Sequence, residues 1–276
     1  MSSRSKDEIK DAVRKHYAEA ITVRGGCCSG SSQDPDDPGR FVPNAGYSIE
    51  EYQAMPEGVT TFGCGNPVSF IDVKPGQTVL DLGSGAGMDL ILAAKKVGPE
   101  GKVIGLDMTD EMIDACRKNL AKAGISNGEV RKGEMEAMPV ADSEVDWIIS
   151  NCVINLSPEK EKVFAEAFRV LKPGGRMLVS DIVTLDLPEE LREDIKAWVG
   201  CIAGAVNESD YMQLARDAGF TDVAIVDKLV YDGPSLNSLA NDACGCGSGS
   251  AEGAVMVDKY AGKVASVKLA ATKPAV

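Results

Sequence analysis

Eight cysteines are the residues of this sequence with the widest capacity for chemistry. One of them, Cys152, stands in the stretch IISNCVINLSPEK, where an apolar strand is followed by the start of a helix. A free cysteine is most often a small buried hydrophobe. In a cytosolic chain, however, eight cysteines indicate metal-binding, redox or catalytic roles more than a permanent disulfide framework.

Composition and charge limit the partners that such cysteines could serve. The 276 residues are 44% hydrophobic and 26% charged, which is typical of a globular protein with a sizeable core. The net charge of −13 argues against nucleic acid or an anionic membrane as partner. No apolar run reaches the roughly 20 residues of a membrane span, and the charged N-terminus lacks the apolar stretch of a signal peptide. We therefore expect a cytoplasmic protein.

A histidine-rich metal centre is excluded by the residue count. The sequence has one histidine, His16, in the first predicted helix. The cysteines do not form the paired CxxC signature of a zinc site. A zinc site built from cysteines alone stays open.

Alternating strands and helices follow from residue 74 onward. The pattern predicts strands at 78–85, 102–108, 128–135, 145–150 and 176–183, and helices at 88–97, 110–124 and 158–171. Pro173, Gly174 and Gly175 are expected to end the last of these helices. Later come helices at 188–205 and 208–220 and strands at 222–231 and 266–274. The alternation predicts an α/β fold, a Rossmann-like, doubly wound, mostly parallel sheet of seven strands.

Regions on either side of this core carry further thiols. Ser5 and Glu8 have capping-box spacing at the start of a helix over 6–21. The Gly/Ser/Asp/Pro-rich stretch 23–40, with Cys27 and Cys28, is predicted to be a mobile surface loop, and a second irregular region carries Cys64. We divide the chain into N-terminal helix and cysteine-bearing loops (1–70), a cofactor-binding domain (71–185), and a C-terminal α+β substrate-binding cap with the last strands (186–276).

The segment VLDLGSGAGMD is the most specific motif. Asp81 ends a strand and is followed by glycines at 83, 85 and 87, which let the backbone turn tightly near a ligand. A G-x-G-x-x-G dinucleotide fingerprint would need glycine where Met88 stands, which disfavours NAD. The motif resembles motif I of the class I S-adenosylmethionine-dependent methyltransferases. Asp107, at the end of the second strand, is placed to accept hydrogen bonds from both ribose hydroxyls.

This resemblance implies further cofactor contacts. Glu134 and Met135 lie at the end of the third strand, where these methyltransferases hold the adenine. The segment RVLKPGG is a sequence motif common among them. With Asp81, Gly83, Gly85, Gly87 and Asp107, we expect Met108, Glu134, Met135 and Asn151 to contact S-adenosylmethionine.

Several cysteines converge on the predicted substrate side of this cofactor. Cys152 follows the fourth strand at the carboxyl edge, Cys201 lies in a helical segment after the fifth strand, and Cys28 and Cys64 precede the first strand. Acid–base catalysis usually needs a group such as histidine, and the one histidine is far away in sequence. Trivalent arsenic takes three sulfur ligands and keeps a lone pair, and soft ligands select soft ions.

The sequence SNCVINLSPEKEKVFAEAFRVLKPGGRMLVSDIV, together with the upstream cysteines and WVGCIAGA, resembles the arsenite methyltransferase family. The resemblance implies that Cys152 and Cys201 bind arsenic directly. It also implies that Cys64 is a further ligand and that Cys64 and Cys28 are redox partners, with Cys27 left open as the alternative to Cys28. A thiol reductant, glutathione or thioredoxin, would be a co-substrate, and an arsenic(III)–thiol conjugate the substrate.

The roles of three more cysteines and two alternative functions are considered next to this interpretation. Cys116 lies inside a predicted helix and is expected to be a core residue; Cys244 and Cys246 either relay arsenic or belong to a linker. A carbon methyltransferase acting on a quinone-like ring shares motif I and LKPGG but has no need of Cys152. A protein that binds metalloids without turnover has no need of motif I.

Overall fold

The protein is described by a computed structural model. The structure describes residues 5–22, 46–56, 59, 61, 63–187, 204–236 and 259–275. Cys27, Cys28, Cys201, Cys244 and Cys246 lie outside these ranges, as do the predicted loop 23–40 and nearly all of the predicted helix 188–205.

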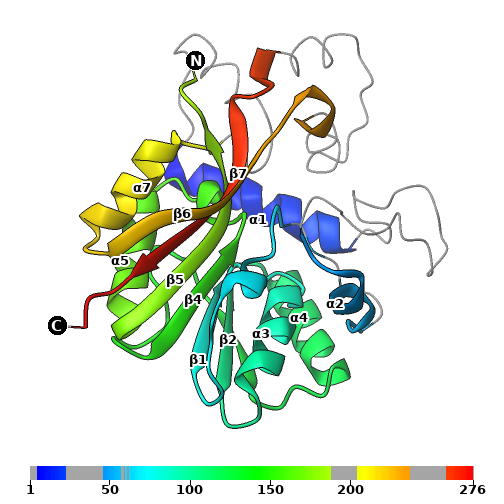
Figure 1. Ribbon diagram of the computed structural model, residues 1–276. Coiled ribbons are helices and arrows are strands. Elements are labelled where there is room, and N and C mark those ends of the chain that lie inside the picture. The colour runs from blue at the N-terminus through cyan, green and yellow to red at the C-terminus, as the bar shows by residue number, and fades with distance from the viewer. Residues whose placement is uncertain are drawn as a thin grey trace.

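A seven-stranded sheet with the order β3-β2-β1-β4-β5-β7-β6 forms the centre of the fold (Figure 1). Its strands are β1 (Thr78–Leu82), β2 (Lys102–Asp107), β3 (Gly128–Lys132), β4 (Val145–Asn151), β5 (Leu171–Thr184), β6 (Thr221–Val230) and β7 (Val264–Thr272). The first five run parallel, and β7 is antiparallel to both of its neighbours. The order reverses between β1 and β4, where open α/β sheets bind their ligands beyond the strands' carboxyl ends. The predicted doubly wound, mostly parallel sheet is confirmed.

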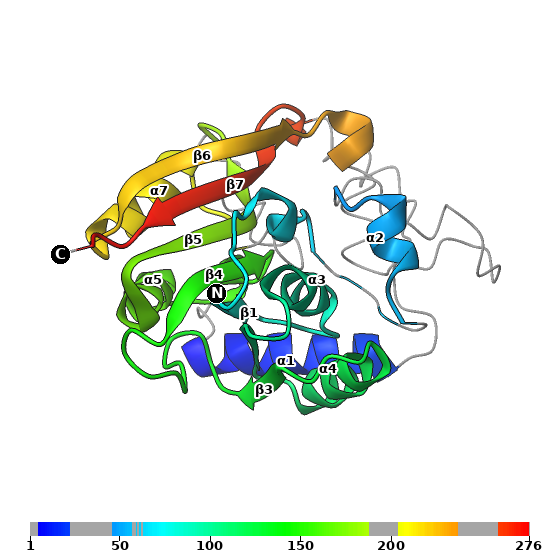
Figure 2. The ribbon, with the colours of Figure 1, turned by 60° about the horizontal axis from the view of Figure 1, so that its bottom comes forward.

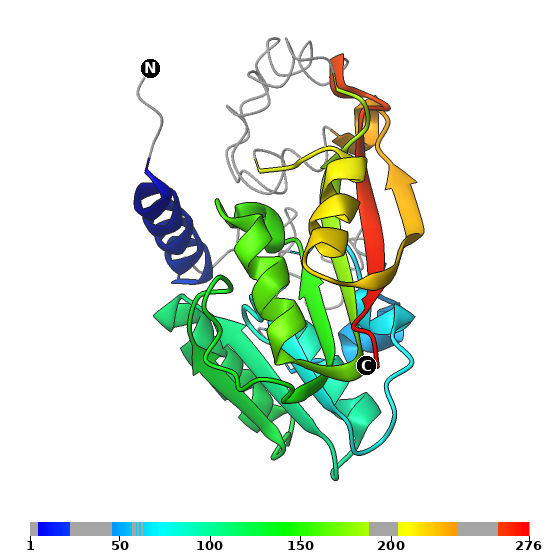
Figure 3. The ribbon, with the colours of Figure 1, turned by 90° about the vertical axis from the view of Figure 1, so that its left-hand side faces the viewer.

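Helices cover both faces of the sheet, and a hydrophobic core lies on each face. The helices are α1 (Lys6–Thr22), α2 (Ile49–Gln53), α3 (Met88–Val97), α4 (Asp110–Lys122), α5 (Lys160–Val170) and α7 (Glu208–Asp217), with short 3₁₀ turns η3 (Pro67–Phe70) and η4 (Ile154–Leu156). α5 and α7 lie side by side on one face (Figure 3), and their Phe164 and Tyr211 share one core with the strands. α3 and α4 pack on the other face, with Leu90 and Ile113 in the second core.

α1 lies across the carboxyl ends of the parallel strands and next to α4 (Figure 2). Its predicted capping box is confirmed: the Ser5 backbone N–H donates to Glu8 Oε2 at 2.7 Å, and the Glu8 N–H donates to Ser5 Oγ at 3.2 Å. Lys6, Lys10 and Arg14 are four residues apart and therefore share one face of the helix. Lys6 pairs with Glu159, and Lys10 and Arg14 pair with Glu134. These contacts place α1 over the site described below.

The predicted start of the fifth strand is wrong. The segment after α5, with Pro173, Gly174 and Gly175, was expected to end the helix and precede the strand, but β5 already begins at Leu171. The reason lies at the other end of the chain: the Lys273 N–H donates to the Gly175 carbonyl at 2.8 Å, and the Gly174 N–H donates to the Lys273 carbonyl at 3.0 Å. Pairing with the residues after β7 thus extends β5 through a segment whose composition is typical of a turn.

Candidate active site

A pocket lies at the carboxyl ends of β1, β2 and β4, beneath α1. Its empty volume is about 970 Å³, counting the space open to solvent. The walls include Cys152 and most of the residues predicted for the cofactor. The cofactor residues among them are Asp81, Gly83, Gly85, Asp107, Met108, Glu134, Met135 and Asn151. The pocket therefore brings a predicted substrate thiol and the predicted cofactor residues together.

The glycine-rich turn connects β1 to α3. Gly87, the one predicted motif glycine that does not line the pocket, is the N-cap of α3 and has φ +93°. A Cβ at this position would lie 2.7 Å from Cys116 Sγ, so only glycine fits without movement of α4. Cys116 is fully buried, and burial raises the pKa of its thiol to about 12. Its prediction as a core residue is confirmed; the structure adds that it packs directly under the turn.

Asp107 binds the turn from the end of β2. Its Oδ2 accepts a hydrogen bond from the Gly85 N–H at 3.0 Å, and its Oδ1 accepts one from the Thr109 N–H at 2.9 Å. Burial raises the pKa of this carboxyl, and the two backbone hydrogen bonds oppose that shift. Asp107 therefore orders the glycine-rich turn and also lines the pocket.

Two buried carboxyls form an acidic wall of the pocket. Asp81 and Asp89 are both almost completely buried, and burial is the main cause of their raised pKa values. The pKa of Asp89 is raised to about 6. The charges of Asp89 and Asp107 raise the pKa of Asp81 further. Asp81 Oδ2 has no hydrogen-bond partner among the described residues. Such a wall suits a cationic ligand group, because a positive charge would satisfy the unpaired oxygen and relieve the repulsion.

The far end of the pocket is formed by the loop after β3, which contains Glu134 and Met135. These two residues were predicted at the end of the third strand, but β3 ends at Lys132. Glu134 accepts a hydrogen bond from Lys10 Nζ at 2.7 Å, and Glu136 lies 3.3 Å from the same nitrogen. Lys10, Val13 and Tyr17 of α1 line this end. The contribution of α1 to the pocket was not predicted from the sequence.

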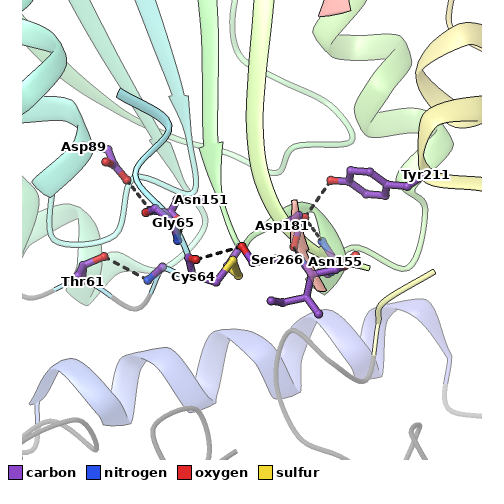
Figure 4. Close-up of a disulfide and its surroundings, with 12 residues drawn as sticks. Thr61, Cys64, Gly65, Asp89, Asn151, Asn155, Asp181, Tyr211 and Ser266 are labelled. Carbon is purple, nitrogen blue, oxygen red and sulfur yellow. Dashed lines mark hydrogen bonds between the residues drawn. A yellow bond between two sulfur atoms is a disulfide. The ribbon is translucent and has the colours of Figure 1, made fainter. Parts of the chain in front are cut away.

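Cys64 and Cys152 are joined by a disulfide with a Cα–Cα distance of 5.8 Å (Figure 4). The two cysteines are 88 residues apart in the sequence. The upstream thiol of Cys64 was predicted to lie close to the pocket thiol of Cys152, and the structure shows this for the pair. In this state neither sulfur is free to bind an ion. Cys152 has a positive φ of 61°, and its N–H donates to the Ser180 carbonyl at 2.8 Å.

On the other side of Cys152, the buried carboxyl of Asp181 fixes the η4 turn. Asp181 Oδ2 accepts hydrogen bonds from Tyr211 Oη at 2.9 Å and from the Asn155 N–H at 3.1 Å. Burial raises the pKa of Asp181 to about 6, while the Tyr211 hydrogen bond and the Lys160 charge oppose the shift. The Lys160 ammonium donates to the Asn155 carbonyl at 3.1 Å.

Asp181 gives an expected pH dependence of stability. Its pKa is higher in the folded protein (about 6) than its usual value of 3.8, so the folded state holds the proton more tightly. This stabilisation is complete below about pH 4 and is lost as the pH rises through about 6, on the order of 3 kcal/mol. Asp181→Asn should therefore flatten the decline in the free energy of unfolding between pH 4 and 7, as measured by urea unfolding. A decline as steep as in the parent protein would contradict the assignment; Asp89 should supply a residual slope of the same sign.

The sequence did not single out Tyr47, Asp89, Lys10 or Asp181. For Asp89 a signal existed, because it directly follows the glycine motif in GMD and lies in the first turn of α3. No such signal marks Tyr47, which reaches the site through tertiary packing alone.

In the described ranges, no helix has the length and apolar character needed to cross a bilayer. The same ranges contain no cluster of three or more histidine, cysteine or acidic side chains suited to a metal ion. Cys28 and Cys201 lie outside those ranges.

The family described as "Methyltransferase domain" matches residues 73–219. The arsenite methyltransferase of Halobacterium salinarum is 42% identical over 239 residues, covering 83% of this chain and 61% of that protein. The crystal structure of an arsenic(III) S-adenosylmethionine methyltransferase from Chlamydomonas reinhardtii superposes with a TM-score of 0.61 and 32% identity, covering 83% of this chain and 71% of that one.

A relative of another activity is the ubiquinone/menaquinone biosynthesis C-methyltransferase of Cronobacter sakazakii, 34% identical over 173 residues, or 62% of this chain and 67% of that protein. The chain spans 61% and 64% of the length of two curated arsenite methyltransferases it matches. The similarity to the arsenite methyltransferases extends over more of this chain than the similarity to the quinone enzyme. With its class I S-adenosylmethionine-dependent methyltransferase fold, the chain belongs to the methyltransferase-domain family and, within it, to the arsenite methyltransferases.

Proposed function

We propose that this chain transfers the methyl group of S-adenosylmethionine to trivalent arsenic held by cysteine thiolates, with arsenite and methylarsenite as substrates, as a step of arsenic detoxification. The observation that carries the proposal is the position of Cys152 in the wall of the pocket that the glycine-rich turn and Asp107 also line. A methyl donor and a thiol-bound acceptor would share one cavity. The similarity to the arsenite methyltransferases supports this substrate.

The residues of the pocket fit S-adenosylmethionine. Asp81 Oδ2 is buried without a partner among the described residues, and with Asp89 it would hold the cationic methionine end. Asp107 and Met108 would contact the ribose, and Glu134 and Met135 the adenine. When bound, the cofactor supplies a methyl carbon made electrophilic by its sulfonium.

The thiols would act after reduction. Two external thiols, from glutathione or a thioredoxin, break the Cys64–Cys152 bond; their sulfurs form a new disulfide, and two electrons and two protons pass to Cys64 and Cys152. An arsenic(III)–thiol conjugate then exchanges its ligands for Cys64, Cys152 and Cys201. Because thiolate is the ligand, each protein thiol gives up its proton, which passes to the thiol that leaves the arsenic. The protein's main contribution is the alignment of the bound arsenic with the methyl donor.

Residues 1–70 would supply the upstream thiols, 71–185 the cofactor site, and 186–276 the substrate-binding cap that carries Cys201. Cys28 would take part in the redox step. We further propose that the protein works in the cytoplasm.

One experiment tests the function directly. The reduced protein is incubated with arsenite, S-adenosylmethionine labelled in its methyl group, and glutathione, and the arsenic species are separated. Labelled methylarsenic species are expected in amounts that grow with time. A parallel reaction replaces arsenite by a demethylated quinone precursor.

The two alternatives give different outcomes in this assay. Label in the quinone and none in arsenic would assign the chain to the carbon methyltransferases, which the similarity to the quinone enzyme makes the second candidate. If the protein bound both arsenite and the cofactor but produced no labelled arsenic, it would be a metalloid-binding protein without turnover. Either result overturns the proposal.

A further inference from the structure

Asn151, the residue before Cys152, binds the backbone that carries Cys64. Its Oδ1 accepts a hydrogen bond from the Gly65 N–H at 3.1 Å, and its Nδ2 donates to the Gly65 carbonyl at 2.5 Å (Figure 4). The side-chain amide thus makes the two hydrogen bonds that a neighbouring strand's peptide group would make. This links residue 65 to the end of β4, 86 positions away in the sequence.

The two glycines beside Cys64 allow this approach. A Cβ at Gly63 would overlap the Asn151 side chain, and a Cβ at Gly65 would overlap Ser180 Oγ. From β7, Ser266 Oγ donates to the Cys64 carbonyl at 3.2 Å. Side chains of β4 and β7 therefore bind the Gly-Cys-Gly backbone, and Ser180 of β5 leaves no room for a side chain at Gly65. Cys64 is the one residue of the three with a side chain.

Two buried groups fix the orientation of the Asn151 amide. Its Nδ2 also lies 3.0 Å from Asp89 Oδ2 and 2.9 Å from Tyr47 Oη. Because the amide has two N–H protons, these two acceptors and the Gly65 carbonyl share them. The Tyr47 hydroxyl donates in turn to Asp89 Oδ1 at 2.8 Å. A flipped amide would direct its oxygen at the carboxylate and its nitrogen at the Gly65 N–H, so these contacts exclude it.

We propose that Asn151 is a positioning residue that holds Cys64 opposite Cys152, with Asp89 and Tyr47 fixing its amide; this role rests on the thiol site proposed above. In the reduced protein the two sulfurs then stay at a high effective concentration toward each other. The same alignment would present both to one soft ion. The assignment differs from a simple cofactor contact, because the Asn151 amide is directed at the Cys64 segment and at the pocket carboxyl of Asp89 together.

The thiol–disulfide equilibrium of the pair measures this positioning without arsenic or cofactor. Reduced protein is equilibrated with defined ratios of reduced and oxidised glutathione. The Cys64–Cys152 bond forms as the glutathione disulfide breaks, and two electrons and two protons pass to two glutathione thiols. After acid quenching and alkylation, mass spectrometry follows the tryptic peptides 41–95 and 133–160, each of which carries a single cysteine of the full chain.

Asn151→Ala is expected to lower the equilibrium constant for disulfide formation about tenfold, because the Cys64 segment loses both hydrogen bonds to β4. Tyr47→Phe, which keeps the packing but removes one orienting contact, should lower it about threefold. The matched control is Asn127→Ala: Asn127 Nδ2 also donates to two backbone carbonyls, of Gly98 at 2.8 Å and Gly101 at 2.9 Å, at the opposite end of the sheet. This control should leave the constant unchanged.

An unchanged constant in folded Asn151→Ala would overturn the proposal, and so would an equal fall in Asn127→Ala, which would show a general effect of lost stability. If Asn151→Ala does not fold, Tyr47→Phe decides in the same way. Because the assay contains neither arsenic nor S-adenosylmethionine, a failure of the arsenic methylation assay leaves this result standing.

Discussion

Serine in place of Cys152 is expected to abolish methylation of both arsenite and methylarsenite. Cys152 is the thiol that lines the pocket, and a hydroxyl is a harder and much less acidic ligand than a thiol. Arsenic would lose the sulfur ligand nearest to the predicted methyl donor, and no other described cysteine lines the pocket. The same result is expected for Cys201→Ser. Turnover of each variant on the two substrates, with circular dichroism to check folding, measures the effect.

Two sets of variants serve as controls. Cys116→Ser should keep full turnover with at most some loss of stability, since its thiol is buried under Gly87 and holds its proton. Cys28→Ser and Cys64→Ser should impair the first methylation of arsenite more than the methylation of methylarsenite, which needs only two thiols. A folded Cys152→Ser protein that methylates arsenite at nearly the parent rate would defeat the arsenic proposal and favour the quinone alternative.

The parts of the fold that the sequence predicted well are those set by local pattern. The helix at 88–97 is observed with the predicted bounds, because a glycine turn, an apolar helical period and Gly98 delimit it. The strand end at Asp107 was placed for a similar reason: a buried apolar run ends at a polar residue. The strand of Asp81 continues for one residue more, to Leu82. In a parallel sheet this is sufficient to bring both carboxyls to one edge.

Features that depend on distant partners were missed. The start of β5 at Leu171 depends on Lys273, and the cover that α1 forms over the pocket depends on ion pairs with Glu134 and Glu159. Nothing in the amphipathic pattern of α1 says which surface its basic face meets. Asn151 was predicted as a cofactor contact, and its pairing with Gly65 could not be predicted, since the two are 86 positions apart.

Alanine in place of Asp107 is expected to weaken S-adenosylmethionine binding about 100-fold or more. The carboxylate faces the pocket from the end of β2, where two ribose hydroxyls would donate to it, and hydrogen bonds to a charged group contribute roughly 1.5–3 kcal/mol each. The variant also loses the hydrogen bonds that Asp107 accepts from the Gly85 and Thr109 N–H groups, so the glycine-rich turn is less ordered before the ligand arrives. Calorimetric titration of S-adenosylmethionine into each protein gives the dissociation constants.

Asp107→Asn and Asp110→Ala separate the two contributions. The asparagine keeps the size of the side chain and one acceptor oxygen, so the turn is partly retained while the charge is lost, and an intermediate affinity is expected. Asp110 is three residues away in the first turn of α4, is 70% exposed and pairs with Lys132 outside the pocket, so its removal should leave the affinity unchanged. If folded Asp107→Ala bound the cofactor as tightly as Asp110→Ala, the carboxylate would have no role in recognising the ribose, and its two backbone hydrogen bonds would be its whole function.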